Sequence, residues 1–413
     1  MGNGSQHRKP GLLFLCHRIP FPPNKGDKIR AFHLLKHLHK HFDISLATFV
    51  DDKNDWAYAP QVRKYCNDSL FVNLVPWLAT LRSLWGFMSG KALSVPFYTN
   101  NEMSRWVENV IAEREIENVI VYSSAMAQFV PATKFSFQRQ VLDFVDIDSD
   151  KWAQYAERKS WPMNWLYQRE ANKLLQLEKE LAEQFDIALF VSSSEAEMFK
   201  QLSPSTAHKI GFYNNGVNTD YFNSAQAGIS PYENLGPVIV FTGAMDYWPN
   251  VDAVEWFVKE VFPGLKEKIQ AIQFFIVGGN PAKSVKQLAR LAGVTVTGRV
   301  DDVRPYIAWA DAAVAPMRVA RGVQNKVLEA MAMEKPVLVS SKGLEGIDAV
   351  DGEHLLLANE PSDYSRLLSR ILDDDFPDIG VNARSHVATN FNWDENLPEV
   401  VTLLGVDTRG ETL

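Results

Sequence analysis

Short apolar segments alternate with longer amphipathic segments along most of the chain, and this alternation restricts the fold more than any other feature. Apolar runs bounded by polar turns are typical of buried strands, whereas 28–41 and the charged segment 163–184 have helical spacing. Strands that alternate with helices form parallel sheets covered on both faces. The first series of predicted strands comprises 11–16, 44–50, 118–123, 140–145 and 186–192.

A stretch rich in Asn, Gly, Ser and Pro interrupts this alternation over residues 211–236, as an interdomain connection does. A second series of predicted strands follows, at 237–243, 272–279, 294–298, 312–317, 336–341 and 354–358. Because 413 residues exceed what one ordinary core holds, we predict an α/β protein with two Rossmann-like, doubly wound domains facing each other across a cleft. The predicted division is a flexible N-terminus at 1–10, domains at 11–210 and 237–393, and a C-terminal helix returning toward the N-terminal domain, with a tail, over 394–413.

Composition excludes several classes of protein. A formal net charge of -8 argues against a general nucleic-acid binder, so we expect no nucleic-acid partner. Cys16 and Cys66 give neither a disulfide framework nor metal-ligand spacing, which indicates a reducing, cytoplasmic setting. The first residues lack the apolar run of a signal peptide, and no window is long and apolar enough to span a membrane.

A Trp- and Leu-rich segment at 74–90 comes nearest to a membrane-active sequence, although Pro76, Arg82 and Gly86 interrupt it. It could rest on a membrane surface beside the basic N-terminal region, because apolar insertion and attraction to anionic lipid would then add together. The interpretation that we favour is an ordinary amphipathic helix packed on its own domain. Peripheral contact with the inner membrane is therefore one of two open interpretations.

The stretch RGVQNKVLEAMA carries the strongest chemical signal. It lies where the predicted strand 312–317 leads into a helix, and helix N-termini collect phosphate oxygens through unpaired N–H groups and a positive dipole end. Glu329 would direct a carboxylate toward the same place, where ribose hydroxyls could donate to it. Gly322 would allow backbone contact, and Lys326 with one of Arg318 or Arg321 would add full charges near a diphosphate. The further candidate substrate contacts in this stretch are Val323, Gln324 and Asn325. The alternative is a surface helix start with solvated basic side chains and a locally paired Glu329.

Glycine turns end three of the predicted strands in the second series. Gly243 follows the first of these strands, GGNP at 278–281 the second, and Gly298 with Arg299 the third. Each alone is an ordinary turn, but together they allow a ligand to approach the backbone closely. Neither GxGxxG after a first strand nor GxxxxGK[ST] occurs, which argues against a dinucleotide fold and a P-loop.

Two segments of the first series are also candidates. In HRIPFPPNKGDKIR, residues 17–30, Gly26 permits an unusual turn, Asp27 lies where a helix N-cap is expected, and Lys25, Lys28 and Arg30 would make the loop positive. In DFVDIDSDKW, Asp146 and Asp148 would face the same way on an extended chain, which suits sugar hydroxyls or proton transfer. Capping of the following helix is the alternative, and two carboxylates alone are a weak metal signal.

The runs VFTGAMDYWPNVDAVEWF, FFIVGG, VTVTGRVDDVRPYIAWADAAVAPMR and RGVQNKVLEAMAMEKPVLVSSKGLEGI resemble the donor-binding half of family 4 glycosyltransferases of the GT-B fold. HRIPFPPNKGDKIR, DFVDIDSDKW and VSSSEAEMF look like the N-terminal half of a bacterial subgroup found with exopolysaccharide and PEP-CTERM sorting loci. The resemblance implies that the N-terminal domain lies on the acceptor side and that the C-terminal domain binds the nucleotide sugar. It implies Glu329 at the ribose, Lys326 and the Gly322 loop at the diphosphate, and backbone near Gly298 at the base.

The chain departs from this family in three places. Arg321 stands where the family has its first acid, Gly243-Ala244 replaces the usual Gly-Arg pair, and the usual Lys is missing around Pro249 and Asn250. We infer that Arg318, Arg321 and Lys326 compensate by approaching the diphosphate from the other side.

The resemblance implies a retaining, metal-independent hexosyltransferase that needs no cofactor. The donor would be a UDP- or GDP-linked sugar, and the acceptor a hydroxyl of a polysaccharide or a lipid-linked glycan in exopolysaccharide synthesis. We assign Lys326 and Arg321 to leaving-group stabilisation and Asp146 as a candidate base, although the leaving phosphate itself can take the acceptor's proton. A GT-B UDP-sugar epimerase and a non-catalytic GT-B scaffold are the alternatives.

Overall fold

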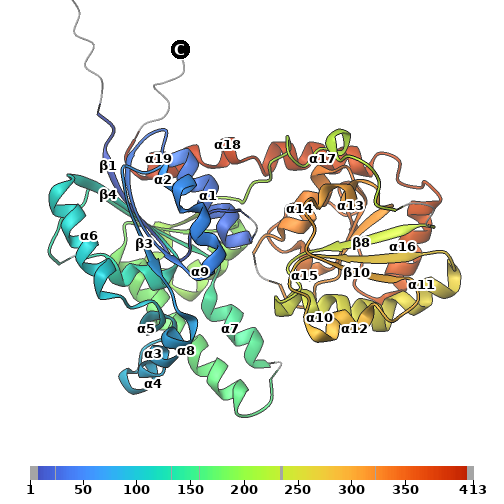
Figure 1. The fold of residues 1–413 in the computed structure, drawn as a ribbon, viewed down its shortest axis with the longest axis horizontal. Helices are drawn as coiled ribbons and strands as arrows, with labels where there is room; N and C mark the ends of the chain where they lie inside the picture. Colours follow the sequence, from blue (N-terminus) through green and yellow to red (C-terminus); the bar gives the residue numbers. More distant parts are fainter. Residues whose placement is uncertain are drawn as a thin grey trace, which may run out of the picture. The chain divides into compact units, whose positions relative to one another are not determined.

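The computed structural model describes residues 8–23, 25–131, 133–157, 159–232, 236–320 and 322–406. The chain forms two compact units (Figure 1). Unit 1 comprises Met1–Tyr213 and Asn396–Leu413, and unit 2 comprises Asn214–Glu395. Each unit has its own sheet and its own hydrophobic core.

The described part of unit 1 contains a seven-stranded parallel sheet in the order β3-β2-β1-β4-β5-β6-β7. Its strands are β1 (Gly11–Cys16), β2 (Asp43–Val50), β3 (Asp68–Asn73), β4 (Ile116–Tyr122), β5 (Arg139–Val145), β6 (Ile187–Phe190) and β7 (Ile210–Phe212). Its helices are α1 (Gly26–Leu38), α2 (Ala59–Arg63), α3 (Pro76–Ser83), α4 (Trp85–Ser89), α5 (Ser94–Tyr98), α6 (Asn101–Glu113), α7 (Asp148–Glu157), α8 (Met163–Gln184), α9 (Ser193–Leu202) and α19 (Pro398–Leu403).

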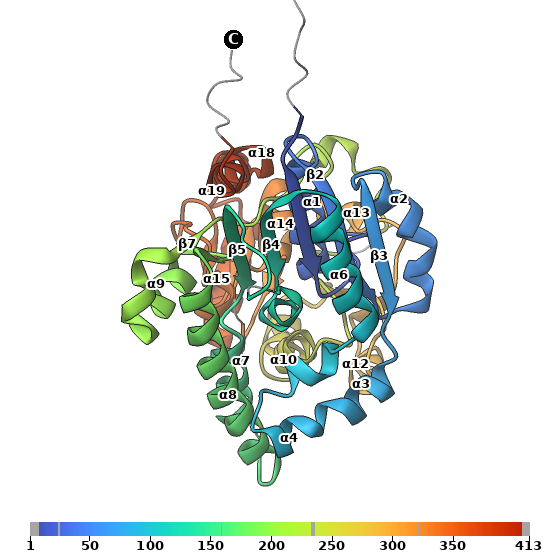
Figure 2. The same ribbon diagram turned by 90° about the vertical axis from the view of Figure 1, so that its left-hand side faces the viewer.

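Helices cover both faces of this sheet, as Figure 2 shows. In β1, Leu13 and Leu15 join the core that contains α6, α8 and α9, whereas the equally buried Leu12 and Phe14 point to the opposite face. Successive side chains of a strand alternate between the faces of a sheet, so a strand covered on both sides must be apolar throughout. This requirement explains the uninterrupted apolar run GLLFLC.

The described part of unit 2 contains a six-stranded parallel sheet in the order β10-β9-β8-β11-β12-β13. Its strands are β8 (Val238–Thr242), β9 (Gln273–Val277), β10 (Val294–Gly298), β11 (Ala312–Ala315), β12 (Val337–Val339) and β13 (Leu356–Leu357). Its helices are α10 (Trp248–Trp256), α11 (Phe262–Lys268), α12 (Lys283–Leu288), α13 (Arg304–Ala308), α14 (Asn325–Ala332), α15 (Ser341–Leu344), α16 (Pro361–Leu372) and α17 (Ile379–Asn390). The short α18 (Trp393–Asn396) ends where the chain passes into unit 1.

The prediction of two parallel, doubly wound α/β domains is confirmed. Sequence periodicity did not reveal β3 and β7, which are the two edge strands of the first sheet. The C-terminal helix expected over 394–405 is instead two short helices, α18 and α19. Pro398 cannot donate a backbone hydrogen bond and therefore begins a new helix.

In both sheets the strand order reverses at one point, between β1 and β4 in unit 1 and between β8 and β11 in unit 2. Open parallel sheets bind ligands beyond the carboxyl ends of the strands at such a point, because the connections there lead to opposite faces and leave a crevice. Each unit therefore has one topologically favoured position for a ligand.

Two kinds of feature are absent from the described residues. These residues include no helix that combines the length and the apolar character needed to cross a bilayer. They also include no cluster of three or more His, Cys, Asp or Glu side chains arranged to hold a metal ion.

Candidate functional site

Lys326 occupies the switch point of unit 2. It lies in the first turn of α14, and its ammonium group donates to Oδ1 of Asn250 at 2.7 Å and approaches Sδ of Met317 at 3.7 Å. It also lies 4.9 Å from the ring centroid of Phe241, a residue of β8. Asn250 belongs to α10 and Met317 follows β11, so segments from both sides of the strand reversal hold this ammonium group.

The charge of Lys326 is poorly neutralised. Burial lowers the pKa of Lys326 from 10.5 to about 8, although the negative charge of Glu329 acts in the opposite direction. Its hydrogen-bond partners are the neutral Asn250 and Met317, and none of the ion pairs between described residues includes it. A partly buried cation with neutral partners is well suited to an anionic ligand, because the anion would supply the missing counter-charge.

Glu329 lies three residues after Lys326, which places both side chains on one face of α14. Burial raises the pKa of Glu329 from 4.5 to about 7, while the charge of Lys326 opposes this rise. The described residues provide no ion-pair partner for this carboxylate either. The sequence-based alternative was solvated cations with a Glu329 paired to a local cation. In the structure Lys326 is buried instead of solvated, and its charge acts on Glu329.

Three glycine-ended strands meet beside Lys326. The N–H of Gly243 donates to the carbonyl of Val277, that of Gly278 to Gly298, and that of Met245 to Gly279. A Cβ on Gly278 would lie 1.7 Å from the carbonyl oxygen of Gly243, and a Cβ on Gly243 would lie 2.8 Å from Nδ2 of Asn250. The backbones are therefore packed too closely for side chains.

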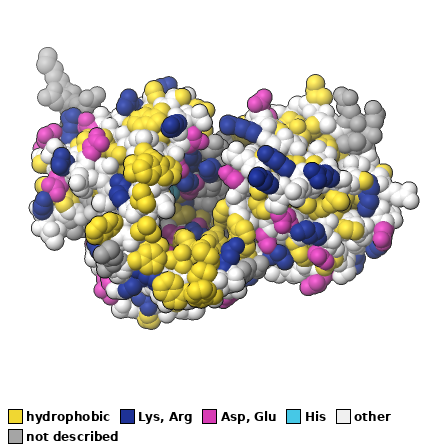
Figure 3. All heavy atoms as spheres, turned by 60° about the horizontal axis from the view of Figure 1, so that its bottom comes forward, with side chains coloured by type: hydrophobic (Ala, Val, Ile, Leu, Met, Phe, Trp, Pro, Cys, Tyr) yellow, Lys and Arg dark blue, Asp and Glu magenta, His cyan; other side chains and the backbone are white. Residues whose placement is uncertain are grey.

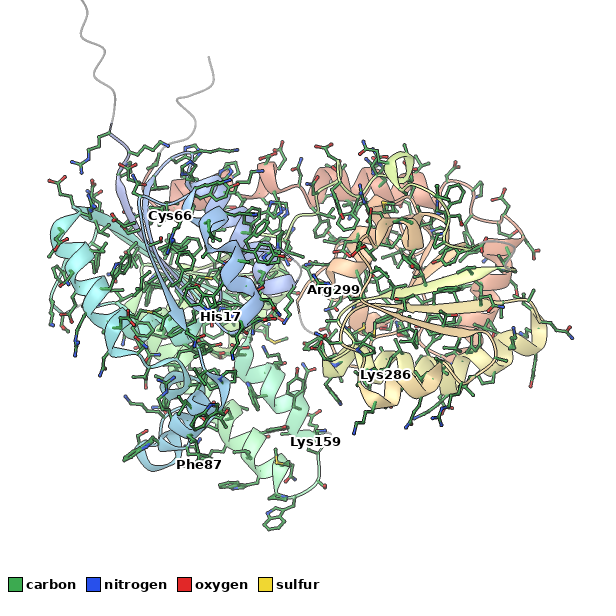
Figure 4. All side chains as sticks on the ribbon, in the orientation of Figure 1. His17, Cys66, Phe87, Lys159, Lys286 and Arg299 are labelled. Atoms are coloured by element: carbon green, nitrogen blue, oxygen red, sulfur yellow. The ribbon has the colours of Figure 1, made fainter. Side chains whose placement is uncertain are left out.

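The end of β10 is more open. A Cβ on Gly298, which has φ +73°, would meet nothing within 4 Å. Arg299 follows it with an exposed side chain, labelled in Figure 4. We predicted that Gly243, Gly298 and Arg299 contact the ligand. All three lie at or just after the carboxyl ends of strands in the sheet of unit 2, at the same edge as Lys326.

The remaining predicted residues of the 318–325 loop have varied surroundings. Arg318 forms an ion pair with Asp252 of α10, with a distance of 2.9 Å from Nε to Oδ2. Gly322 has a left-handed φ of +61°, and Val323 is buried. Gln324 is the N-cap residue of α14, and Asn325, its first residue, accepts a hydrogen bond from Asn215 at 3.3 Å. Arg321 lies outside the described residues.

A cluster that sequence reasoning missed lies near Glu329. The hydroxyl of Tyr221 bonds to Asp302, whose carboxylate also pairs with Arg304, and the guanidinium of Arg304 stacks over the Tyr221 ring at 4.1 Å. Burial raises the pKa of Tyr221, and the negative charges of Asp302 and Glu329 raise it further. Tyr221 lies in the segment 211–236, which appeared in the sequence to be only a connection, so no local signal identified it.

The switch point of unit 1 holds His17, which directly follows β1. Its ring stacks on Tyr122, the last residue of β4, at a centroid distance of 5.8 Å, and contacts Tyr98 edge-on at 6.1 Å. Nε2 lies 3.4 Å from Oδ2 of Asp27, whereas Nδ1 is buried and has no hydrogen-bond partner among the described residues. Figure 4 labels His17 within unit 1. The rule that ligands bind beyond strand ends could have selected this residue from the sequence.

Asp27 does not cap the helix, so that prediction was wrong. The N-cap of α1 is Lys25, and Gly26, an exposed residue, begins the helix without strain from a positive φ. Asp27 instead accepts a hydrogen bond from Arg18 at 2.6 Å. Burial would raise the pKa of Asp27, but the hydrogen bond from His17 and the charge of Arg18 hold it well below its ordinary value. Asp27 is therefore a carboxylate anchor at the switch point of unit 1.

The expected positive charge of the 17–30 loop was also wrong for two of its residues. Lys28 is buried and pairs with Asp55. Arg30 is fully buried and donates to both carboxylate oxygens of Asp143, at 3.0 and 3.2 Å. Both cations are therefore neutralised inside unit 1 and are not available to a ligand.

Asp146 and Asp148 do not lie on an extended chain, so the basis for that prediction was wrong. β5 ends at Val145, which has a left-handed φ of +72°, and Asp148 begins α7, where it pairs with Lys151. The two carboxylates nevertheless remain close. Burial raises the pKa of Asp146, the positive charge of Lys151 lowers it, and the charge of Asp148 raises it further.

Comparisons with known proteins agree with this architecture. Residues 236–374 match the sequence model described as glycosyl transferases group 1. A search of curated proteins gave no match. Sucrose-phosphate synthase from Thermosynechococcus elongatus is similar in structure, with a TM-score of 0.69 and 19% identity, covering 96% of this chain and 98% of that one. HepE of Anabaena, in complex with UDP and glucose, gives a TM-score of 0.67 and 15% identity over 96% of this chain and 100% of that one.

A glycosyltransferase from Rickettsia africae is a third similar structure, with a TM-score of 0.64 and 14% identity over 96% of this chain and 98% of that chain. These similarities extend over both units. The region that matches the family model lies within unit 2 and includes β8 to β13, α10 to α16 and most of the residues around Lys326. Assignment to family 4 and to the exopolysaccharide subgroup stays a prediction. The chain thus has the GT-B fold, and residues 236–374 of unit 2 form a domain of the glycosyl transferase group 1 type.

Proposed function

We propose that the protein is a retaining hexosyltransferase that uses a nucleoside diphosphate sugar and a hydroxyl acceptor on a polysaccharide or a lipid-linked glycan. The group 1 match supports glycosyl transfer. Structures of the similar HepE contain UDP with glucose, or UDP-glucose, which favours a UDP-linked donor. A role in exopolysaccharide synthesis follows from the sequence resemblance.

The observation that carries this proposal is the buried ammonium group of Lys326, whose hydrogen-bond partners are neutral, at the switch point of unit 2. A diphosphate would give this ammonium group negatively charged oxygen acceptors in place of its neutral partners. The N-terminus of α14 adds backbone N–H groups and a positive dipole end, and the glycine-ended strands allow phosphates to approach the backbone. Metal would not be required, because these groups perform the electrostatic role of a divalent cation.

Glu329 and the Tyr221 cluster supply the nucleoside side of the proposed site. Glu329 would accept hydrogen bonds from vicinal ribose hydroxyls, and the open backbone at Gly298 would contact the base. Tyr221, fixed by Asp302 and stacked with Arg304, presents an aromatic ring that is partly exposed. Several predicted roles stay proposals. We propose that the donor is also bound by Arg299, Gly322, Val323, Gln324, Asn325 and Arg318. We propose further that Arg321 acts in catalysis and that the acceptor is bound by Gly26, Asp27 and Asp148.

The difficult step is departure of the diphosphate from the anomeric carbon. Negative charge grows on the phosphate oxygens in the transition state, and a preorganised Lys326 stabilises this charge without first reorganising solvent. In a front-face retaining reaction the departing phosphate oxygen accepts the proton of the attacking hydroxyl, so no side-chain nucleophile is needed. Asp146, whose pKa is raised, stays the candidate base on unit 1.

Titration calorimetry with UDP, GDP and ADP tests the nucleotide site. We expect one of these nucleotides to bind wild-type protein and Lys326→Ala to weaken that binding at least about tenfold, a loss of roughly 1.4 kcal/mol. Lys286→Ala is the matched control, because Lys286 is an exposed lysine on α12 of the same unit. A protein that binds none of the three would be a non-catalytic scaffold, and the proposal would fail.

Incubation with the donor alone separates transfer from epimerisation. A transferase leaves the nucleotide sugar nearly intact until a hydroxyl acceptor is added, whereas an epimerase converts the sugar without any acceptor. With donor and acceptor together, NMR of the product reports whether the anomeric configuration is retained. Inversion of configuration would contradict the proposed mechanism even if transfer occurs.

A further inference from the structure

Two segments of unit 1 expose an unusual number of large apolar side chains at one end of the unit. We define the apolar tip as α3, α4, residues 159–162 and the first turn of α8. Its exposed side chains include Trp77 (64%), Leu81 (53%), Leu84 (53%), Trp85 (66%), Trp161 (79%) and Trp165 (58%). Figure 3 shows hydrophobic side chains gathered on this end of unit 1. Contiguous exposed apolar surface of this kind marks an interaction site, because isolated soluble proteins rarely leave it uncovered.

Side-chain contacts join the two segments of the apolar tip. The guanidinium of Arg169, in α8, donates to the carbonyl of Gly86 at 2.8 Å and stacks over the Phe87 ring at 4.5 Å. The carboxylate of Glu170 accepts a hydrogen bond of 2.7 Å from the backbone of Leu93. These contacts fasten the start of α8 to the loop that follows α4, and Figure 4 labels Phe87 and Lys159 on the two segments. The exposed tryptophans of α3 and α4 and those at the start of α8 therefore belong to connected segments of unit 1.

The charge around the apolar tip is opposite to that of the whole chain. Residues 74–100 contain two basic residues and no acid, and residues 155–168 contain two basic residues and one acid. The described basic residues among these are Arg82, Lys91 and Lys159, the described acid is Glu157, and Arg158 lies outside the described residues. The neighbouring Glu170 is buried, and its carboxylate lies 3.5 Å from Arg169. The tip is thus net positive, although the chain as a whole carries -8.

We propose that the apolar tip docks unit 1 onto the surface of a lipid bilayer that contains anionic lipid. Tryptophan is enriched at the boundary between acyl chains and headgroups, because its ring is apolar and its N–H is polar. Neighbouring Lys and Arg side chains add electrostatic attraction to anionic headgroups, and this attraction adds to the burial of apolar area. The combination of exposed tryptophans with a net positive surround therefore fits a membrane surface better than a neutral protein groove.

This docking does not depend on the proposed sugar transfer, since the apolar tip and the Lys326 site lie in different units. It does agree with a lipid-linked acceptor, because a docked unit 1 would meet an acceptor anchored in the same bilayer. The two proposals can fail separately. If the protein binds UDP but no vesicles, the docking proposal fails and the transferase proposal stands. If it binds vesicles but no nucleotide, the transferase proposal fails and the docking proposal stands.

Co-sedimentation of the full chain with vesicles tests the surface. We expect wild-type protein to sediment with vesicles of phosphatidylcholine and phosphatidylglycerol, more weakly with phosphatidylcholine alone, and less as the NaCl concentration rises. The double variant Trp85→Ser/Trp161→Ser should lower the partition coefficient at least about tenfold. The matched control is Trp309→Ser, because Trp309 is an exposed tryptophan of unit 2, and its partitioning should equal that of wild type.

Three outcomes would overturn the proposal. The first is wild-type protein that stays in the supernatant with both kinds of vesicle. The second is a double variant that partitions like wild type while circular dichroism shows that both are folded. The third is a wild-type protein that binds no vesicles and is a dimer in analytical ultracentrifugation, while the double variant is a monomer. A second copy of the chain would then cover the tip.

Discussion

Replacing Lys326 by Met should stabilise unit 2 while it weakens nucleotide binding. The ammonium group of Lys326 is partly buried with neutral hydrogen-bond partners and therefore destabilises the protein without ligand. Methionine has a similar length and no charge, and it can pack against Phe241 and Met317. A residue retained for binding at the expense of stability is typical of a functional site.

The size of the effect follows from the pKa. Burial lowers the pKa of Lys326 from 10.5 to about 8, and each pKa unit corresponds to about 1.4 kcal/mol. Below pH 8 both the folded and the unfolded protein hold the proton, so the full cost of about 3 kcal/mol is present. Between about 8 and 10.5 only the unfolded chain holds it, and wild-type stability therefore rises with pH through this window. Because Lys326 keeps some exposure, we expect a measured difference of about 2 kcal/mol at neutral pH.

Urea unfolding of the full chain measures this difference, with hydrogen exchange of peptides from β8 and α14 as the probe for unit 2. The free energy of unfolding of wild type and Lys326→Met should differ most at neutral pH and converge toward pH 10.5. Lys286→Met, on the exposed face of α12, should match wild type at every pH. The reasoning is refuted if Lys326→Met is less stable than wild type at neutral pH, or if the difference does not change with pH.

Three further predictions follow from other contacts. Affinity for UDP should fall as pH rises above about 8, where Lys326 loses its proton, and calorimetry of Lys326→Ala should show no such dependence. Gly278→Ala should destabilise unit 2 by about 3 kcal/mol or more, because the new Cβ would lie 1.7 Å from the carbonyl oxygen of Gly243. Gly298→Ala should cost only about 1 kcal/mol, because its Cβ would meet no atom within 4 Å and only the left-handed φ is unfavourable. Thermal unfolding measures both. Burial raises the pKa of Glu178 from 4.5 to about 8, so the free energy of unfolding of unit 1 should fall as the pH rises from 4.5 to 8. Glu178→Gln should remove this fall, and a variant whose urea unfolding has the same pH dependence as wild type would contradict the prediction.

The sequence was most informative where one local rule decides the structure. The apolar run Gly11–Cys16 becomes the interior strand β1, because only a strand covered on both faces needs apolar residues at every position. The helical spacing of 163–184 likewise gives α8 with the same bounds. The edge strands β3 and β7 have a neighbour on one side only, so they tolerate polar residues and lack the same pattern.

The sequence alone also determined that Lys326 and Glu329 share one face of a helix that follows a strand, because helical geometry fixes that relation within a few residues. Only the tertiary structure decided which cations are available to a ligand. Lys28 and Arg30 resembled exposed loop cations, but Asp55 and Asp143, distant in the sequence, neutralise them inside unit 1. Lys326 is held instead by the neutral Asn250. Whether a charge is satisfied depends on what distant segments bring beside it, and local spacing carries no information about those segments.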